Sequence, residues 1–595
     1  MATHVMALGI TFAAFLLLAV SYFGWGKLLF RLLGVGGGAR QGVAIPIWLG
    51  WATTLFGFQL VHLGWPLSGW IVAPVLLAGL VPAALFRREV RRREIWGDVP
   101  AWQILLVAGA FACYAVWLAS KAMWTPVLYD SGLYHFQTIR WLNTHPIVPG
   151  LGNLHDRLAF NQSYFAYVAS LNLFPYFGHG RSLANSFLVL LTVGMFLPSV
   201  LDVLRRPLAL RGRHSFRLLG LFVIPLVLYR SLAVDYMASP SPHLSVSLLL
   251  IVLFDLLMRG VADWRAGHRE QDMRCVSVIL LAATAVTVKL STVVVAGAIA
   301  AAALAYWWRR YRLRWRAWLR PLVPAAAVLV LWMGRGVILS GAPLMPSTAG
   351  YVEADWAMPR EAIVKCHRAI AWWARDPGIH GFRSEDGWAW LTPWLGRAWS
   401  CRTAVVFPLA GGVVCLALAA LLHAWWKQRP GGQWLVVVPI AAGLVFWFFT
   451  APGLRFSRPL FWLLFVAGAL LLLDVLRTRF NAKAYLGALV VIFAAGHAPL
   501  CRDALARRYE LGRISRTGWH EVPTASLKTA TTASGLRVHV PVEGQMSWEA
   551  PLPCALRLHP NLRLRTPGDL SSGFTVAPPE AAGEQRPDVS GSSRR

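Results

Sequence analysis

Long apolar stretches separated by short polar connectors make up most of the chain. Each stretch approaches the ~20 apolar residues that a helix needs to cross a bilayer. Because only helices and closed barrels satisfy the backbone inside lipid, the pattern predicts about fourteen transmembrane helices. They are expected at residues 5–30, 43–62, 66–86, 101–120, 183–204, 216–232, 243–258, 275–289, 292–308, 321–341, 403–424, 433–450, 459–476 and 484–500.

Three long connectors interrupt this pattern: 121–182, 342–402 and everything after residue 500. Function is expected there, because these segments are too polar to remain in lipid. The predicted division is an added N-terminal transmembrane bundle at 1–100, a transmembrane module at 101–500, a small exported β-rich region at 501–576 and a disordered tail at 577–595.

Two local periodicities refine this picture. Apolar residues at Leu133, Phe136, Ile139 and Leu142 have helical spacing, which predicts an amphipathic helix lying on the membrane interface. Alternating apolar and polar residues at 535–541 and 555–559 predict short strands.

Composition supports a membrane protein. The chain is 57% hydrophobic with a mean hydropathy of +0.52, far above a soluble protein. The expected fold class is therefore all-α and multi-spanning, with amphipathic helices on the outer face and a small β-rich C-terminal appendage. The net charge of +30 comes from short clusters between the apolar spans, so we expect no nucleic-acid partner.

The basic clusters all fall on one side of the membrane if the spans alternate as predicted. That side is the cytoplasm, because cytoplasmic connectors carry an excess of lysine and arginine. We therefore expect a bacterial cytoplasmic (inner) membrane protein whose functional loops and C-terminus lie on the periplasmic side. The largest clusters are Arg87, Arg88, Arg91, Arg92 and Arg93; Arg205, Arg206, Arg211, Arg213 and Arg217; and Arg309, Arg310, Arg312, Arg314, Arg316 and Arg320.

Asp130 is the first candidate for chemistry. It follows the fourth span directly, and a carboxylate at a membrane edge needs a cation, a proton or water. The alternative is that Asp130 and Ser131 only cap the helix that begins near Gly132, since both residue types are favoured N-caps.

Three basic residues near the outer surface are candidates for binding an anion. Arg455 and Arg458 occupy a short outer turn where the positive-inside bias disfavours arginine, and guanidinium groups suit phosphate. Lys289 lies at the turn between two spans, where it either meets an anionic phosphate or reaches the lipid headgroups.

Other polar and aromatic residues near these loops have two interpretations each. His135 follows Asp130 at helical spacing and either orients the carboxylate or lies at the interface. Asp235 and His243 flank a proline-stiffened outer turn that is either part of a site or a rigid connector. The tryptophans of 342–402 form either an interface belt or a surface for sugar rings or a lipid chain.

Four of the seven cysteines fall in the predicted exported regions. An even number of exported thiols indicates disulfides. Four cysteines allow three pairings, and local bridges favour Cys366 with Cys401 and Cys501 with Cys554.

A span followed at once by an acidic outer loop, then interface helices and a hairpin ending near a lysine, resembles the GT-C superfamily of integral membrane glycosyltransferases. The resemblance rests on Asp130 in YDSGLYH (129–135) and, more loosely, on Asp235 and Lys289, and it covers residues 101–480. It implies that a sugar passes from a polyprenyl-phosphate donor to an acceptor on the outer face. Asp130 would be the general base, and basic residues would stabilise the lipid phosphate: Lys289, Arg455 and Arg458.

The chain departs from that superfamily in two respects. The acidic loop follows the fourth span instead of the first, so 5–86 is an added bundle. Asp130 is followed by Ser131 where many members have a second acidic residue. A second carboxylate would come from Asp156 or Asp235, or the reaction would be independent of metal. No cofactor is certain, and a divalent cation stays open.

Other classes of protein compete with this interpretation. An O-antigen ligase or polymerase would concentrate arginine and histidine in one late loop, and 342–402 contains both. A secondary transporter would need ionisable groups near span centres, which are scarce here. An envelope-assembly scaffold would show no convergent charges. Neither a Walker A motif nor a zinc-type cysteine spacing is present.

Overall fold

The structure is a computed structural model of the 595-residue chain. It describes residues 2–35, 43–87, 99–173, 176, 178–212, 215–231, 234–262, 268–312, 314–377, 387–427, 431–506 and 518–576.

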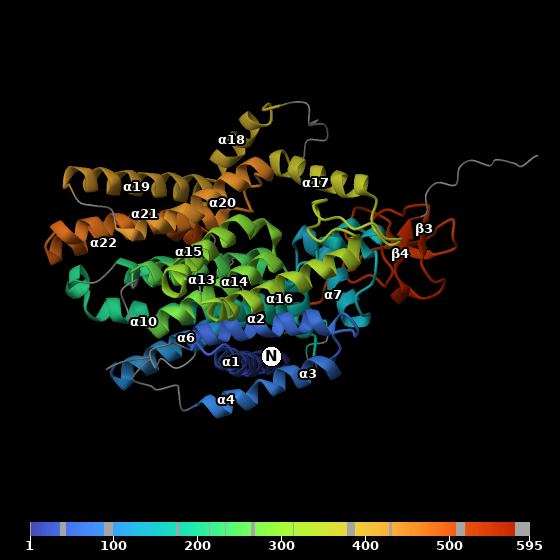
Figure 1. Ribbon diagram of the computed structural model, residues 1–595, viewed down its shortest axis with the longest axis horizontal. Helices are drawn as coiled ribbons and strands as arrows, with labels where there is room; N and C mark the ends of the chain where they lie inside the picture. Colours follow the sequence, from blue (N-terminus) through green and yellow to red (C-terminus); the bar gives the residue numbers. More distant parts are fainter. Residues whose placement is uncertain are drawn as a thin grey trace, which may run out of the picture.

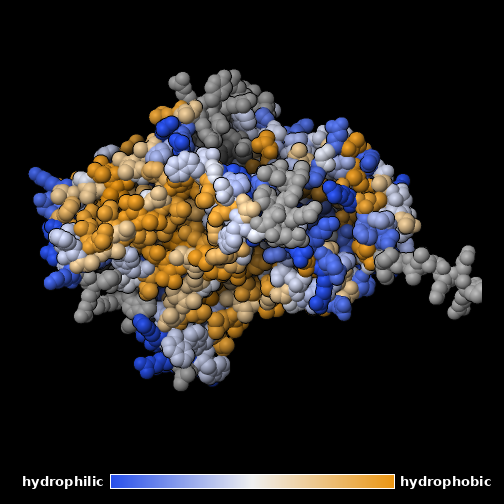
Figure 2. Space-filling view, turned by 90° about the horizontal axis from the view of Figure 1, so that it is seen from above, coloured by the Kyte–Doolittle hydropathy of each residue, from blue (hydrophilic) through white to orange (hydrophobic). Residues whose placement is uncertain are grey.

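Most helices run side by side along the long axis of the molecule (Figure 1). Thirteen helical segments among the described residues are long and apolar enough to cross a membrane. Figure 2 shows an apolar band over the helices and hydrophilic residues towards both ends. The chain is therefore a multi-pass helical membrane protein, and the predicted fold class is confirmed.

Fifteen helices among the described residues form the bundle. Its helices are α1 (Ala2–Leu32), α2 (Ala44–Val61), α3 (Gly69–Ala78), α4 (Leu80–Phe86), α6 (Ala101–Ala122), α10 (Arg181–Arg205), α11 (Leu219–Ser231), α13 (Pro242–Ala262), α14 (His268–Val288), α15 (Val293–Tyr311), α16 (Trp315–Ser340), α19 (Phe407–Trp425), α20 (Val437–Thr450), α21 (Arg458–Arg479) and α22 (Ala482–Ala506). Shorter elements connect them: η2 (Ser131–His135), α7 (Phe136–Thr144), α8 (Leu151–Leu154), η3 (Asp156–Phe160), α9 (Tyr164–Ser170), η4 (Pro207–Gly212), η5 (Ser215–Leu218), α12 (Val234–Ala238), η6 (Leu290–Thr292), α17 (Arg360–Arg375), α18 (Leu391–Ser400), η7 (Arg402–Val406) and η8 (Gly432–Val436).

The predicted span at 216–232 is shorter than the others. There the chain forms the 3-10 turn η5 and then α11, which has 13 residues. Arg217 and Arg230 bound its apolar part, so the run is too short for a full-length span. This helix accounts for the difference between the fourteen predicted spans and the thirteen long segments.

The first helices pack with unusually close backbones because glycines lie at their crossings. A Cβ added to Gly50 of α2 would lie 1.6 Å from the Tyr22 carbonyl oxygen of α1. At Gly26 of α1 the corresponding distance to the Pro46 carbonyl oxygen is 1.8 Å. Small residues allow such contact between membrane helices, whose association depends on van der Waals packing.

Contacts between basic clusters place them at one end of the bundle. Arg211 Nε donates to the Arg477 carbonyl oxygen at 3.4 Å, and Arg274 Nη1 donates to the Arg259 carbonyl oxygen at 3.4 Å. Arg479 lies over the Trp426 ring. We call this the arginine end. The opposite end, which carries α7, α17 and the strands (Figure 1), is called the loop end.

The segment after Asp130 is not an amphipathic helix on the membrane surface. It forms the π-helical turn η2 followed by α7, and Leu133, Phe136, Ile139 and Leu142 are all buried. Part of this apolar face is covered by the C-terminal appendage, where the Phe136 and Trp548 rings lie 6.0 Å apart.

The C-terminal appendage contains two small antiparallel sheets. Strand β1 (Leu527–Thr531) pairs with β2 (Arg537–Pro541), and β3 (Leu562–Leu564) pairs with β4 (Phe574–Val576). The strand predicted at 535–541 is therefore present as β2. The one predicted at 555–559 is wrong, because this segment forms no strand. Prolines flank it, and they donate no backbone hydrogen bond.

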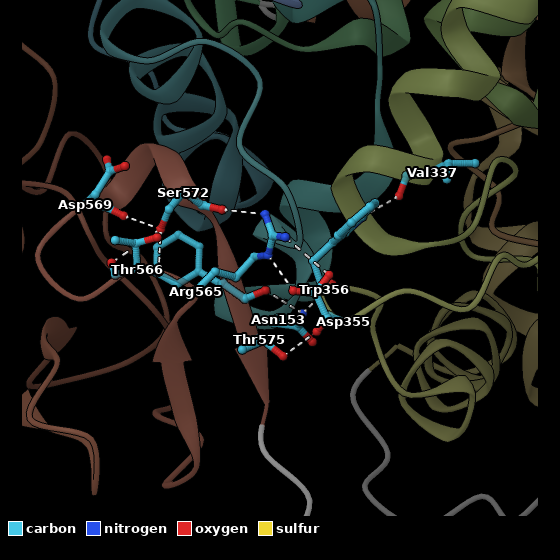
Figure 3. Close-up of polar contacts among 10 residues, drawn as sticks. Asn153, Val337, Asp355, Trp356, Arg565, Thr566, Asp569, Ser572 and Thr575 are labelled. Carbon is cyan, nitrogen blue, oxygen red and sulfur yellow. Dashed lines mark hydrogen bonds and ion pairs between the residues drawn. The ribbon is translucent and has the colours of Figure 1, made fainter.

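The appendage joins both long loops (Figure 3). Arg565 Nε donates to Asp355 Oδ2 at 2.7 Å, and Thr575 Oγ1 donates to the Asp355 carbonyl oxygen. Asn153 Nδ2 donates to the carbonyl oxygens of Trp356 and Phe574. Residues from 121–182, 342–402 and the C-terminal region therefore form one connected layer at the loop end.

The predicted disulfides are wrong, because all seven cysteines are free thiols. Cys366 is buried in α17, and Cys554 is buried in the appendage. Cys401 is partly buried after α18, and Cys501 is exposed on α22. Each belongs to a different element, so closeness in sequence did not predict closeness in space.

Candidate functional site

Asp130 stands directly before η2 and forms an ion pair. Although it occupies the N-terminal capping position of this turn, its side chain makes no capping hydrogen bond. Oδ2 lies 2.9 Å from Nη2 of Arg455, and the carboxylate is mostly buried. The ion pair thus favours a cation partner over the helix-capping interpretation.

Arg455 comes from the turn between α20 and α21 and lies between aromatic rings. Its guanidinium carbon is 4.3 Å from the centre of the Trp373 ring and 5.3 Å from that of Phe456. These contacts fix the plane of the guanidinium group beside Asp130. Its buried Nε has no hydrogen-bond partner among the described residues, so one N–H remains for a ligand.

Lys289 and His243 also contact Phe456. The imidazole of His243 stacks parallel to the Phe456 ring, with centroids 5.6 Å apart. Lys289 Nζ is 2.8 Å from His243 Nδ1 and 4.7 Å from the centre of the Phe456 ring. A single aromatic residue therefore joins the two cationic side chains, Lys289 and Arg455.

The ammonium group of Lys289 titrates near neutral pH. Burial, and to a lesser extent the positive charge of Arg455, lower the pKa of Lys289 to about 7, and Asp130 partly opposes the shift. An anionic ligand would favour the protonated form, because opposite charge stabilises it.

His135 lies near the charged groups of this site, since Asp130, Arg455 and Lys289 all act on its pKa. It is fully buried, and its Nδ1 is 3.1 Å from Ser131 Oγ. Burial lowers the pKa of His135 to about 3, so the ring is neutral at physiological pH. The closest polar partner of His135 is thus Ser131, which holds the turn after Asp130.

A separate cavity of about 870 Å³ is lined by residues of α11, α12, α21 and α22 and by the segment before α19. Its wall combines apolar residues such as Phe407 and Trp462 with four arginines from separate elements. Arg230 Nη1 donates to Ser247 Oγ at 3.1 Å, and Ser247 bonds the carbonyl oxygen of His243. Asp130 is not in the cavity wall. The four arginines are Arg230, Arg402, Arg458 and Arg502.

The structure brings together Asp130, His243, Lys289 and Arg455. Arg458 is three residues further along and lines the cavity. Asp235 belongs to α12, but its side chain lies outside the described residues. Asp156 lies 4.0 Å from His155.

Several residues of the site were not predicted from the sequence. Phe456 gave no signal, since apolar aromatics are common in this chain, whereas Trp373 is one of the tryptophans of 342–402 that the sequence marked only as an interface belt or a surface for sugar rings or a lipid chain. Arg230, Arg402 and Arg502 could have been found by the same argument that selected Arg455. They border spans at the end opposite the main basic clusters, where the positive-inside bias disfavours arginine.

The C-terminal appendage holds the turn that carries Asp130. The backbone N–H groups of Ser547 and Trp548 both donate to the carbonyl oxygen of Gly132, at 2.8 and 2.9 Å. Tyr129 donates to Gln545 Oε1 at 2.6 Å, and Gln137 donates to the Trp548 carbonyl oxygen. The residues on both sides of Asp130 are therefore anchored from the far end of the chain.

Among the described residues, no group of three or more histidine, cysteine, aspartate or glutamate side chains is arranged to hold a metal ion.

Comparisons with known proteins give a family and no activity. The model of a family described as "Domain of unknown function (DUF8201)" matches residues 8–462. No curated protein and no solved structure is significantly similar to the chain.

Proposed function

The chain belongs to the DUF8201 family, and we propose that it is a membrane glycosyltransferase that moves a sugar from a polyprenyl-phosphate donor to an acceptor. The observation that carries the proposal is the Asp130–Arg455 pair, 2.9 Å apart, beside Lys289. One carboxylate next to several cations suits a reaction in which a hydroxyl loses a proton and a phosphate leaves.

The proposed reaction inverts the configuration at the anomeric carbon. Asp130 takes the proton of the acceptor hydroxyl as its oxygen forms a bond to this carbon. The bond from the same carbon to the phosphate oxygen breaks, and the lipid phosphate leaves with the electron pair. Arg455 and Lys289 stabilise the charge that develops on this phosphate.

The cavity that Arg458 lines, which Arg230 and Ser247 connect to His243, suits the lipid-linked donor. Its arginines provide charge for phosphate, and Phe407 and Trp462 provide an apolar wall for the first part of a polyprenyl chain. Arg458 Nε is buried without a hydrogen-bond partner among the described residues, which leaves a donor for this ligand.

The ligase-like alternative receives less support. The acidic groups of 342–402 that the structure describes are engaged away from Asp130 or exposed: Asp376 pairs with Arg397 at 2.9 Å, and Asp355 pairs with Arg565. His367 is exposed. The loop 342–402 contacts Arg455 through the aromatic ring of Trp373, which is neither an arginine nor a histidine.

The proposed location is the cytoplasmic membrane of a bacterium, with the loop end on the periplasmic side. The arginine end then faces the cytoplasm, as the distribution of basic residues favours. An acceptor on cell-envelope glycan, lipid or protein would approach from outside.

A donor panel tests the proposal. Purified protein in lipid nanodiscs is incubated with different polyprenyl-phosphate sugars and an envelope extract as acceptor, and donor and product are followed by mass spectrometry. We expect one donor to be consumed, with release of polyprenyl phosphate. If a folded preparation consumes no donor in the panel, the proposal is wrong.

Lys289 gives a pH-dependent prediction. Because its pKa is about 7, lowering the pH from about 8 to about 6 adds a positive charge at the site. Polyprenyl-phosphate binding, measured by titration calorimetry in nanodiscs, should therefore tighten as the pH falls. The phosphate itself loses charge over this range and cannot cause the trend. Lys289→Met should abolish the tightening, and a variant that retains it would contradict this role.

A further inference from the structure

A buried arginine, Arg335, lies away from the proposed site, where α16 meets α2. The side chain of Arg335 is buried, and its partners are neutral. Nη1 donates to the Gln59 carbonyl oxygen at 3.0 Å and lies 3.2 Å from His62 Nδ1. Burial and the charge of Arg335 lower the pKa of His62 to about 2, so His62 is uncharged.

Arg335 borders a small cavity of about 40 Å³. Its wall also includes His62, Trp141 and Gln162, and it contains no aspartate or glutamate. Two buried N–H groups of this wall, Arg335 Nε and Trp141 Nε1, have no hydrogen-bond partner among the described residues.

These features are typical of a site for negative charge. A buried cation without a counter-ion is unfavourable, and an unsatisfied buried N–H adds to the cost. Water could bond the N–H groups, but it would not neutralise the guanidinium. The Gln162 Oε1 atom also lacks a partner, and turning its amide by half a rotation would present a further donor to the cavity.

We propose that this cavity binds a small inorganic anion such as chloride, held between Arg335 Nε and Trp141 Nε1. The volume has room for about three water molecules, which suits a monatomic ion with residual water better than phosphate. The anion links α2 and α16 to α7, the helix that follows the Asp130 turn. This inference is independent of the proposed transferase activity.

Thermal unfolding in different salts tests the inference. The full-length protein in nanodiscs is heated in sodium chloride or sodium gluconate at the same ionic strength, and tryptophan fluorescence is followed. We expect a higher Tm in chloride, with a saturable dependence on its concentration. Equal Tm values in the two salts would mean that only water occupies the cavity, and would overturn the proposal. A rise with phosphate but none with chloride would also overturn it.

Two variants locate the effect. Arg335→Met should abolish the difference between chloride and gluconate, whereas Arg565→Met, which removes an exposed arginine, should retain it. If Arg335→Met does not fold, Trp141→Phe keeps the aromatic ring and removes one donor. It should raise the chloride concentration for half-maximal stabilisation several-fold. Unchanged chloride dependence in Trp141→Phe, or full dependence in a folded Arg335→Met, would contradict the site.

Discussion

Replacing Asp130 with asparagine should abolish sugar transfer while the protein is still made and inserted. Asparagine has nearly the same shape, but it cannot accept the proton of the acceptor hydroxyl. Loss of a general base typically costs ~10²–10⁴-fold in rate. The measurement is donor consumption by purified Asp130→Asn in nanodiscs, compared with wild type at equal protein concentration.

A second aspartate at the loop end provides the matched control. Asp355 also pairs with an arginine, Arg565, at 2.7 Å, but it belongs to the contact between loop and appendage. Asp355→Asn should retain most of the activity. Wild-type transfer by Asp130→Asn would remove Asp130 from the catalytic role. Equal losses in the two variants would indicate a structural effect.

Replacing Gly50 with alanine should destabilise the protein more than other single methyl additions in the bundle. The new Cβ would lie 1.6 Å from the Tyr22 carbonyl oxygen, so α1 and α2 would have to separate. We expect a loss of at least about 3 kcal/mol in the free energy of unfolding, at the upper end for overpacking. Fluorescence-detected size-exclusion chromatography after heating measures the lower Tm.

Gly57 in the same helix is the control. A Cβ at this position meets no atom within 4 Å. Because alanine also favours a helix more than glycine does, Gly57→Ala should leave Tm unchanged or slightly raised. A similar loss of stability at both positions would show that the α1–α2 contact is looser than the structure indicates.

Most of the fold could be predicted because lipid imposes a strong constraint on the sequence. Apolar runs near the length of a bilayer must be helices, so the pattern located all thirteen long segments. The apolar pattern gave a wrong prediction where an apolar face packs against other parts of the protein instead of against lipid. The apolar face of α7 predicted a helix on the membrane surface, but this face is buried within the protein, and Trp548 of the appendage covers part of it. Periodicity shows that a face is buried, and it does not show what buries it.

The candidate site could be predicted only in part. Asp130, Lys289 and Arg455 were recognisable because each places a charge where a membrane protein normally avoids one. Their mutual contacts were not, since Asp130 and Arg455 lie far apart in the sequence. Phe456 contacts both Lys289 and Arg455, but it is uncharged, so nothing in the sequence distinguished it from other aromatic residues. The cysteine prediction failed for a similar reason, because closeness in sequence did not bring the thiols together, and all seven are free.

The contact between Gly132 and Ser547 has a consequence for biogenesis. These residues are separated by 415 positions, so the ribosome makes the Asp130 turn long before it makes the segment that covers it. A nascent or prematurely terminated chain would expose this turn without its cover. The Asp130 turn would therefore reach its final surroundings only after the C-terminal appendage has been made and has folded against it.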